Sequence, residues 1–252
     1  MNNEEYFFSD FTEDSYRKYI QLAKENYRFI LYPEIDKSAS GQCLWRHDID
    51  YSPQRALKLA QIENALNVRS TFFVLMHAEY YNALEKENTD IFRNILSLGH
   101  TIGLHFDLPY FGSRIQNLED LSQFLLIEKE YLENIIENQI DVFSFHNPGF
   151  NDSLNFDQKM IAGMINVYSK EIKENFSYTS DSFCIWKNKR LLDVLTQAND
   201  RNIQILTHPV CWSEKESSPH ERILRSIEGR KEKTLQIYME RSERFGRKKI
   251  DW

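Results

Sequence analysis

Two aspartates at the end of an apolar stretch are the residues in this sequence best suited to hydrolytic chemistry. Asp48 and Asp50 follow Leu44 and Trp45, and Pro53 opens a helical pattern shortly afterwards. Residues two apart on a strand share one face. One carboxylate of such a pair can bind a cation while the other takes a proton from water, and the cation keeps its neighbour ionised.

Four of the seven histidines also end apolar stretches, which side-chain packing explains poorly. They are His47, His105, His146 and His208. If these stretches are parallel strands, their carboxyl ends meet at one edge of the sheet. Imidazole and carboxylate groups gathered there suit Zn²⁺ or a similar divalent ion, and such an ion with an open position activates water. The pattern therefore predicts a metal-assisted hydrolytic site.

The elements that must position these residues alternate between strand and helix along nearly the whole chain. Apolar runs predict strands at 28–32, 42–47, 69–76, 101–105, 141–145, 165–168, 176–178 and 203–207. Helical spacing predicts helices at 13–26, 53–66, 89–98, 117–138, 156–163, 190–198 and 219–244. Such alternation implies a mainly parallel sheet with outer helices. We expect an α/β fold, a distorted (β/α) barrel of about seven parallel strands; an open doubly wound sheet is the alternative, weakened by the absence of a Gly-x-Gly-x-x-Gly turn.

The bulk properties of the 252-residue chain fit a globular protein of ordinary composition. Hydrophobic residues make up 41% and charged residues 27%, which is unlike a disordered chain. The formal net charge of −7 argues against a nucleic-acid partner, which would require a basic face. We expect one domain over 1–252, with a core at about 42–212 and helical additions at both ends.

Cysteine usage and the N-terminus favour a cytoplasmic protein. Cys43, Cys184 and Cys211 include no Cys-x-x-Cys pair, so we expect reduced, buried thiols rather than disulfides or a thiolate zinc site. The start, Met1 to Glu5, is acidic and polar, unlike a signal peptide. No stretch approaches about 18 continuous apolar residues, so we expect no membrane span.

The segment Gly99-His100-Thr101-Ile102-Gly103-Leu104-His105, together with the strand end at Asp48 and Asp50, resembles the polysaccharide deacetylases, carbohydrate esterase family 4. The resemblance covers roughly 44–212. It implies a distorted barrel that uses a divalent metal, Zn²⁺ as first choice, to remove N-acyl groups from amino sugars. It also implies that Asp48 is the catalytic base and that Asp50 and His105 are metal ligands. The family keeps the two acids adjacent, whereas Ile49 separates them here.

The family's remaining ligand is missing, because Pro109 stands where a second histidine is expected. Two residues are candidates for the vacancy: His146, at the end of the next strand, and Asp107, two residues past His105. We favour His146, since an imidazole restores the family's ligand set. The arginine that orients the base in the family is also absent, and Arg46 is a candidate replacement.

The last apolar stretch, Ile205-Leu206-Thr207-His208-Pro209, resembles the family's final motif. By that resemblance His208 is the acid that protonates the leaving amine, and Trp212 forms an apolar wall near the acyl group. Further substrate contacts are expected from Asp107, Asn147 and Asp181, the last in a segment, 178–186, that resembles a substrate-side loop.

Together with the strand-end pattern, the resemblance implies a metal-dependent amide hydrolase that removes an acetyl or formyl group from an amino sugar. Its expected context is surface polysaccharide biosynthesis, on a nucleotide- or lipid-linked sugar. The missing ligand leaves a second hypothesis, a non-catalytic relative that binds glycans or proteins. A third is the same chemistry on an amide that is not a sugar.

Overall fold

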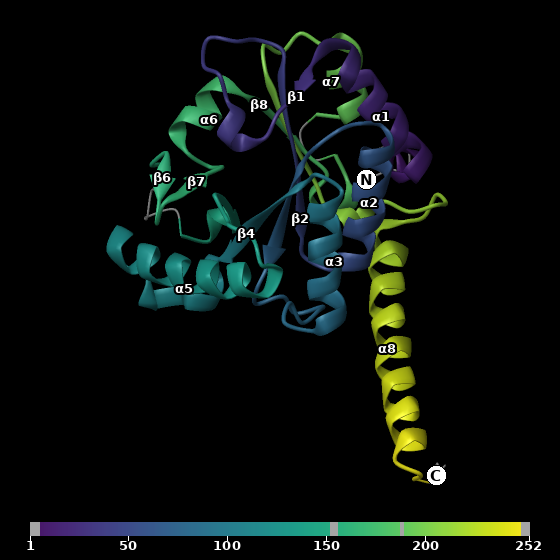
Figure 1. The fold of residues 1–252 in the computed structure, drawn as a ribbon. Helices are drawn as coiled ribbons and strands as arrows, with labels where there is room; N and C mark the ends of the chain where they lie inside the picture. The colour runs from purple at the N-terminus through teal and green to yellow at the C-terminus, as the bar shows by residue number, and fades with distance from the viewer. Residues whose placement is uncertain (1–5, 152–155, 187–188, 248–252) are drawn as a thin grey trace.

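The computed structural model describes residues 6–151, 156–186 and 189–247, and Figure 1 shows a curled sheet with helices around it. The strands are β1 (Arg28–Phe29), β2 (Gln42–Ile49), β3 (Thr71–Leu75), β4 (Thr101–Asp107), β5 (Val142–His146), β6 (Met160–Ile161), β7 (Met164–Asn166), β8 (Ser177–Ser180) and β9 (Ile203–Thr207). The α-helices are α1 (Glu13–Asn26), α2 (Pro53–Ala65), α3 (Lys86–Ser97), α4 (Leu108–Phe111), α5 (Leu118–Ile136), α6 (Lys170–Asn175), α7 (Leu191–Gln197) and α8 (Pro219–Arg244).

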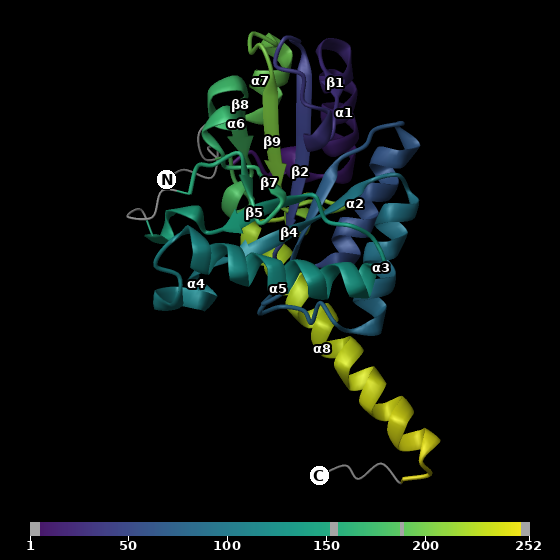
Figure 2. The same ribbon diagram turned by 60° about the vertical axis from the view of Figure 1, so that its left-hand side comes forward.

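Within the described residues the strands form one nine-stranded sheet in the order β6-β7-β5-β4-β3-β2-β9-β8, with β1 added beside β2. Every pairing is parallel except that of β6 with β7. Strand β2, which leads into the two aspartates, lies next to β9, the last strand of the chain, as Figure 2 shows. This curled, mostly parallel sheet confirms the predicted α/β fold of distorted-barrel type rather than the open doubly wound alternative.

Side chains alternate between the two faces of the sheet and separate its core into layers. On β3, Phe72 and Val74 lie in the apolar cluster that α3 and α5 cover, whereas Phe73 lies in a smaller cluster with Leu44 and Val142. The period of two along a strand produces this division. Both faces of β2 and β3 are buried, which is why β3 reads as a nearly continuous apolar run rather than as an alternating one.

One predicted helix is wrong. The stretch 156–163 forms no helix; β6 and β7 pair there as an antiparallel hairpin. Its two-residue loop is Ala162-Gly163, and both residues have positive φ values of 52° and 74°. That pair of left-handed residues is the geometry of a tight hairpin turn whose twist matches the strands, so turn conformation outweighed the helical spacing of the apolar residues.

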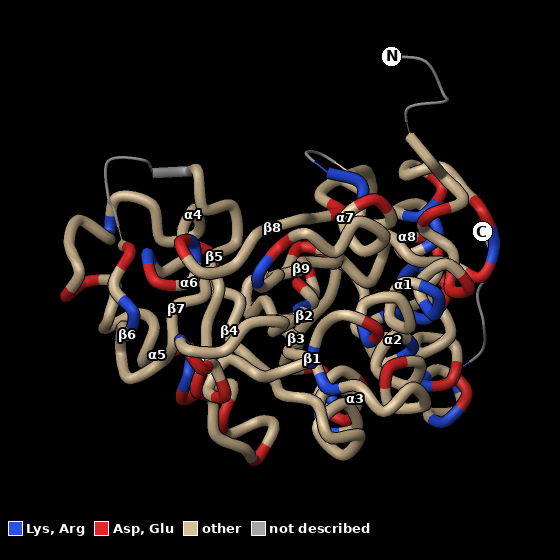
Figure 3. Tube along the Cα trace, turned by 90° about the horizontal axis from the view of Figure 1, so that it is seen from above, with Lys and Arg blue, Asp and Glu red and all other residues tan. Residues whose placement is uncertain are grey.

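Helix α8 extends away from the rest of the protein (Figure 1) and agrees with the predicted range of 219–244. Ser218 caps its first turn in a reciprocal pair of hydrogen bonds with Glu221. Basic and acidic residues are interspersed along it and along α1 and α2, as Figure 3 shows. In the described parts of the chain, no helix is long and apolar enough to cross a membrane. Residues 1–5, on which the expectation about a signal peptide depends, lie outside those parts.

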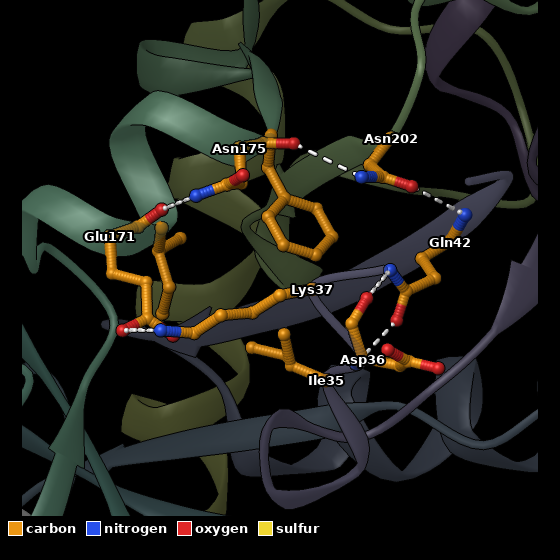
Figure 4. A pocket seen from close by; sticks show the side chains of 9 residues that line it. Ile35, Asp36, Lys37, Gln42, Glu171, Asn175 and Asn202 are labelled. Atoms are coloured by element: carbon orange, nitrogen blue, oxygen red, sulfur yellow. Dashed lines mark hydrogen bonds and ion pairs between the residues drawn. The ribbon is translucent and has the colours of Figure 1, made fainter. Parts of the chain in front are cut away.

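A small cavity lies at the amino ends of β2 and β9, away from the candidate catalytic residues. Figure 4 shows that its polar walls are already paired: Lys37 Nζ lies 2.9 Å from a Glu171 carboxylate oxygen, and Asn202 donates to the Asn175 carbonyl. Its volume is about 10 Å³, which holds about one water molecule. This cavity is therefore too small to hold a substrate.

Candidate metal and acid–base site

Strand β2 carries an arginine and the first aspartate of the pair on one face. Arg46 and Asp48 are both buried, and Arg46 Nη2 lies 2.9 Å from Asp48 Oδ2. The same guanidinium donates to the Tyr168 hydroxyl at 2.9 Å. Asp48 Oδ1 has no hydrogen-bond partner although it is buried. The arginine thus fixes one carboxylate oxygen and leaves the other free to accept a proton.

The register of β4 and β5 places two further pairs at the same end of the sheet. His105 lies opposite Ser144, and Asp107 lies opposite His146. Accordingly, His105 Nδ1 is 2.6 Å from Ser144 Oγ, and His146 Nδ1 is 3.1 Å from Asp107 Oδ1. When each Nδ1–H donates to its oxygen, the lone pair of each Nε2 is free to bind a cation.

Asp50, just past the end of β2, lies between the histidines of two strands. Its Oδ1 is 3.3 Å from His105 Nε2, and its Oδ2 is 3.6 Å from His208 Nε2. Burial alone would raise the pKa of Asp50, but the neighbouring His105 and His208 side chains hold that pKa well below its usual range. These neighbours favour the charged form of the Asp50 carboxylate.

His208 follows β9 and forms a dyad with Asp181. Its Nδ1 lies 2.7 Å from Asp181 Oδ1, and its backbone N–H donates to the same carboxylate at 2.9 Å. Burial would lower the pKa of His208, but the hydrogen bond to Asp181 outweighs burial and raises the pKa to about 9. With Nδ1 bound to Asp181, the proton that His208 can deliver is the one on Nε2, which faces Asp50.

The donors at this end of the sheet suit a divalent ion in type and in their closest spacing. Two ligands of one Zn²⁺ at about 2.1 Å in tetrahedral geometry lie about 3.4 Å apart, and Asp50 Oδ1 and His105 Nε2 are 3.3 Å apart. Asp50 Oδ1 is also buried without a hydrogen-bond partner. In the described residues, however, no three His, Cys, Asp or Glu side chains stand as a formed ion site. A third donor would have to move inward.

His146 and Asp107 remain the two candidates for that third donor, and the structure gives them different positions. The rings of His105 and His146 are 5.3 Å apart, at 70° to each other. Asp107 lies against His146 Nδ1, which is the place of a carboxylate that orients a ligand histidine. Asn147, exposed and with a left-handed φ of 51°, turns the chain directly after His146. This arrangement favours His146 as ligand and Asp107 as its support.

Trp212 does not lie where the apolar wall was expected. Its side chain is completely buried, and its Nε1 donates to Asp181 Oδ2 at 2.9 Å. Asp181 is also fully buried and faces His208 rather than an open surface. Both residues therefore belong to the support of His208 and make no surface for a substrate. The physical reason is the Asp181 carboxylate, whose second oxygen needs a donor inside the protein.

His47 and His100 point away from the site, to the opposite face of the sheet. His47 Nε2 lies 2.9 Å from Glu63 Oε1, and His100 Nδ1 lies 3.5 Å from Glu63 Oε2. Glu63 also accepts from Ser70 and Tyr16. This group is a buried polar network on the far face of the sheet, so these two histidines have a structural role.

The expectation of three reduced thiols is wrong. Cys184 and Cys211 form a disulfide across 27 residues of sequence, and Cys43 is buried and free. The two cysteines follow β8 and β9, which are neighbours in the sheet, so they meet despite their distance in sequence. Disulfides persist mainly in oxidising compartments, and cysteine usage therefore no longer supports a cytoplasmic location.

Two supporting residues escaped sequence reasoning. Ser144 precedes His146 by two positions and so shares its face of β5, a signal that was available in the strand pattern. Tyr168 reaches Arg46 from beyond β7, 122 residues away in sequence, and no local pattern indicates that contact.

The sequence matches no family model and no curated protein. Solved structures do match, at low identity. A family 4 carbohydrate esterase pseudoenzyme from Bacillus anthracis has a TM-score of 0.42 and 14% identity, over 76% of this chain and 60% of its own. A family 4 carbohydrate esterase from Bacillus anthracis has a TM-score of 0.43 and 16% identity, over 86% of each chain. A polysaccharide deacetylase from Bacillus cereus has a TM-score of 0.40 and 16% identity, over 76% of this chain and 88% of its own.

These structures come from the family that the motifs of this chain resemble. The chain spans less than two thirds of the pseudoenzyme's length. At such identities the roles of individual residues do not transfer from these structures to this chain.

Proposed function

We propose that this protein is a metal-dependent amide hydrolase that removes an N-acyl group from an amino sugar. The single observation that carries the proposal is the position of Asp50. It lies between His105, on the side where an ion would bind, and His208, on the side where a proton would be delivered. Metal-assisted hydrolysis of an amide requires a base for the attacking water, a site for the ion and an acid for the leaving amine.

Asp48 acts as the base. Its Oδ2 is held by Arg46 and its Oδ1 has no hydrogen-bond partner, so Oδ1 is the atom that takes the proton from the attacking water. The water oxygen forms a bond to the acyl carbon, and the amide becomes a tetrahedral intermediate. Asp50, His105 and His146 would hold the ion, which supplies a Lewis acid for the water and the acyl oxygen.

His208 acts as the acid in the second half of the reaction. The carbon–nitrogen bond breaks, and the amine nitrogen takes the proton of His208 Nε2. Asp181 stabilises the protonated imidazole before the transfer and holds its ring in place. The products are a free carboxylic acid and an amino sugar. We further propose Zn²⁺ as the ion and surface polysaccharide assembly as the context.

Metal binding and product release, measured separately, test the proposal. The full chain, reconstituted with Zn²⁺, is expected to bind one ion and to release acetate from N-acetylglucosamine oligosaccharides. His105→Ala is expected to lose both the ion and the activity. Asp48→Asn is expected to keep the ion and lose about 1000-fold in kcat.

Three outcomes would each redirect the proposal. Loss of the ion in Asp48→Asn would mean that the two aspartates have exchanged roles. Release of acid from simple amides but from no sugar would move the same chemistry to a different substrate. Wild-type protein that binds no divalent ion would favour the non-catalytic hypothesis, in which the fold only binds a glycan or protein.

A further inference from the structure

The dyad of Asp181 and His208 lies on two similar turns that the disulfide joins. In the turn after β8, the Cys184 N–H donates to the Asp181 carbonyl at 2.8 Å. In the turn after β9, the Cys211 N–H donates to the His208 carbonyl at 2.9 Å. The dyad connects the two turns at their first residues, and the disulfide connects them at their fourth residues. The two turns therefore form one closed frame.

The turn after β8 has a backbone conformation that its own residues do not favour. Phe183 and Cys184 have φ values of 59° and 58°, in the left-handed region that bulky side chains rarely adopt. Such a conformation persists only where the surrounding structure holds it. The disulfide is a covalent link between this turn and the turn after β9, and both of its cysteines are buried. It therefore stabilises the turn that begins at Asp181.

The orientation of the His208 ring depends in turn on Asp181. Asp181 Oδ1 lies 2.7 Å from His208 Nδ1 and accepts from the His208 backbone N–H at 2.9 Å. These contacts direct His208 Nε2 toward Asp50 Oδ2, 3.6 Å away. In the proposed reaction, on which this inference rests, Nε2 delivers the proton to the leaving amine. A misplacement of about 1 Å in such a group can lower a rate about 100-fold.

The donors of the candidate ion site belong to other strands. Asp50 follows β2, while His105 and His146 lie on β4 and β5. In the sheet order, β4 and β5 lie on the opposite side of β2 from β9 and β8. Loss of the disulfide is therefore expected to disturb the acid and to leave the ion site in place.

We propose that Cys184 and Cys211 are positioning residues for His208, and that the site becomes fully active only when their disulfide has formed. Formation of the bond removes one electron and one proton from each thiol. A second disulfide, such as oxidised glutathione, accepts the two electrons and two protons by exchange and leaves as two thiols. Oxidation thus completes the acid half of the site, whereas the ion half is present in either state.

Removal of both sulfur atoms tests the inference in the full, Zn²⁺-loaded chain. The disulfide-free variant, Cys184→Ala with Cys211→Ala, is expected to lower kcat about 10- to 100-fold. Its KM and Zn²⁺ affinity are expected to stay within about twofold of wild type. Cys43→Ala is the matched control, because it removes a buried free thiol. This control is expected to leave kcat, KM and Zn²⁺ affinity unchanged.

The His208→Ala background separates positioning of the acid from a general loss of structure. This background has no acid to position, so removing the disulfide there should lower the residual kcat by less than about twofold. A loss as large as the one seen with His208 present would overturn the inference. Loss of Zn²⁺ or an unchanged kcat in the disulfide-free variant would overturn it as well.

An NMR signal of His208 tests the inference apart from activity. The Nδ1–H proton in the hydrogen bond to Asp181 gives a signal that is assigned by its absence in His208→Ala. The signal is expected in wild type and in Cys43→Ala, and it should broaden or disappear in the disulfide-free variant. If the signal depends on the disulfide but wild-type protein releases no acid, the proposed function fails while the positioning of His208 stands. An unchanged signal without the disulfide would overturn the positioning.

A second disulfide-free variant covers the case in which the double alanine protein does not fold. Cys184→Ala with Cys211→Val keeps more of the apolar volume of the two side chains and takes its place in every comparison. If circular dichroism shows that neither variant folds, the disulfide is required for the fold itself, and the specific positioning role is overturned.

Discussion

Arg46, inside β2, places a fixed positive charge beside Asp48, the base of the proposed reaction. Its guanidinium lies between the rings of Phe73 and Tyr168, 5.4 Å and 5.0 Å from their centroids, and contacts Asp48. A lysine keeps the positive charge but loses the planar guanidinium, which packs against the two aromatic rings and orients its hydrogen bonds. Arg46→Lys is therefore expected to lower kcat about 100-fold, as small misplacements do, with KM and Zn²⁺ affinity unchanged.

Steady-state kinetics and zinc titration check this prediction, and Tyr168→Phe is its control. Removing that hydroxyl takes away one of the contacts of Arg46 and is expected to cost less than about tenfold in kcat. An Arg46→Lys protein that loses zinc but keeps kcat in the remaining holoenzyme would show that Arg46 supports the ion site instead.

Substitutions of His146 and Asp107 are expected to affect zinc binding to different degrees, which distinguishes the roles of the two residues. If His146 is the third ligand and Asp107 orients it, His146→Ala should abolish stoichiometric zinc binding, whereas Asp107→Asn should weaken it by about 10- to 100-fold. Competition with a chelator of known affinity measures both. Wild-type affinity in His146→Ala, together with loss of zinc in Asp107→Asn, would reverse the assignment.

At the scale of the element, β4 can lie against β3 only because Gly103 has no side chain. A Cβ at this position would stand 2.5 Å from the Phe73 ring and 3.1 Å from Val142. Gly103→Ala is therefore expected to destabilise the protein by about 1–3 kcal/mol through overpacking, and to move His105 on the same face of the strand. Equilibrium unfolding in urea and zinc affinity both report the effect.

Gly229 on α8 offers the matched control, because nothing lies within 4 Å of a Cβ added there. Gly229→Ala is expected to be neutral or to stabilise by up to about 1 kcal/mol, the difference in helix propensity. The smaller side chain of Phe73→Leu should restore part of the stability lost in Gly103→Ala. Equal effects of the two alanine substitutions would mean that backbone freedom, and not the Phe73 ring, makes Gly103 necessary.

At the scale of the whole molecule, Glu63 ties several elements together from one buried position. On α2, it contacts Tyr16 of α1, His47 of β2, and Ser70 and His100 before β3 and β4. Burial would raise the pKa of Glu63, but the charge and hydrogen bond of His47 outweigh burial and hold that pKa below its usual value. The charged carboxylate therefore stabilises the folded state.

Because the pKa of Glu63 is lower in the folded than in the unfolded chain, its contribution is complete above about pH 4.3. It is lost as the pH falls through the folded pKa. Glu63→Gln is expected to cost about 2 kcal/mol at pH 7, and this difference should shrink as the pH falls below about 4. Urea unfolding at several pH values measures this difference in stability.

Glu228→Gln is the control, because Glu228 is exposed, and its stability should stay within about 0.5 kcal/mol of wild type. A difference between Glu63→Gln and wild type that stays constant with pH would contradict a charged Glu63 carboxylate in the folded protein.

The sequence by itself determined where chemistry is available. Asp48, Asp50, His105 and His208 each end an apolar run, and a strand end is a local property that a period of two and a following turn reveal. The strand–helix alternation likewise predicted the fold class, since each strand must return parallel to its neighbour through a helix. Helix α8 was predicted to its last residue because Ser218, Pro219 and the long charged pattern are all local signals.

Only the tertiary structure decided which of these residues support one another. The disulfide, the dyad of Asp181 with His208, and the contact of Tyr168 with Arg46 join residues 27 to 122 positions apart. Those contacts depend on the order of the strands in the sheet and on the register of their pairing. A shift of one residue in register would turn every side chain of a strand to the other face. The burial of Trp212 also depends on tertiary structure, because the Asp181 carboxylate, which follows β8, accepts a hydrogen bond from its indole N–H.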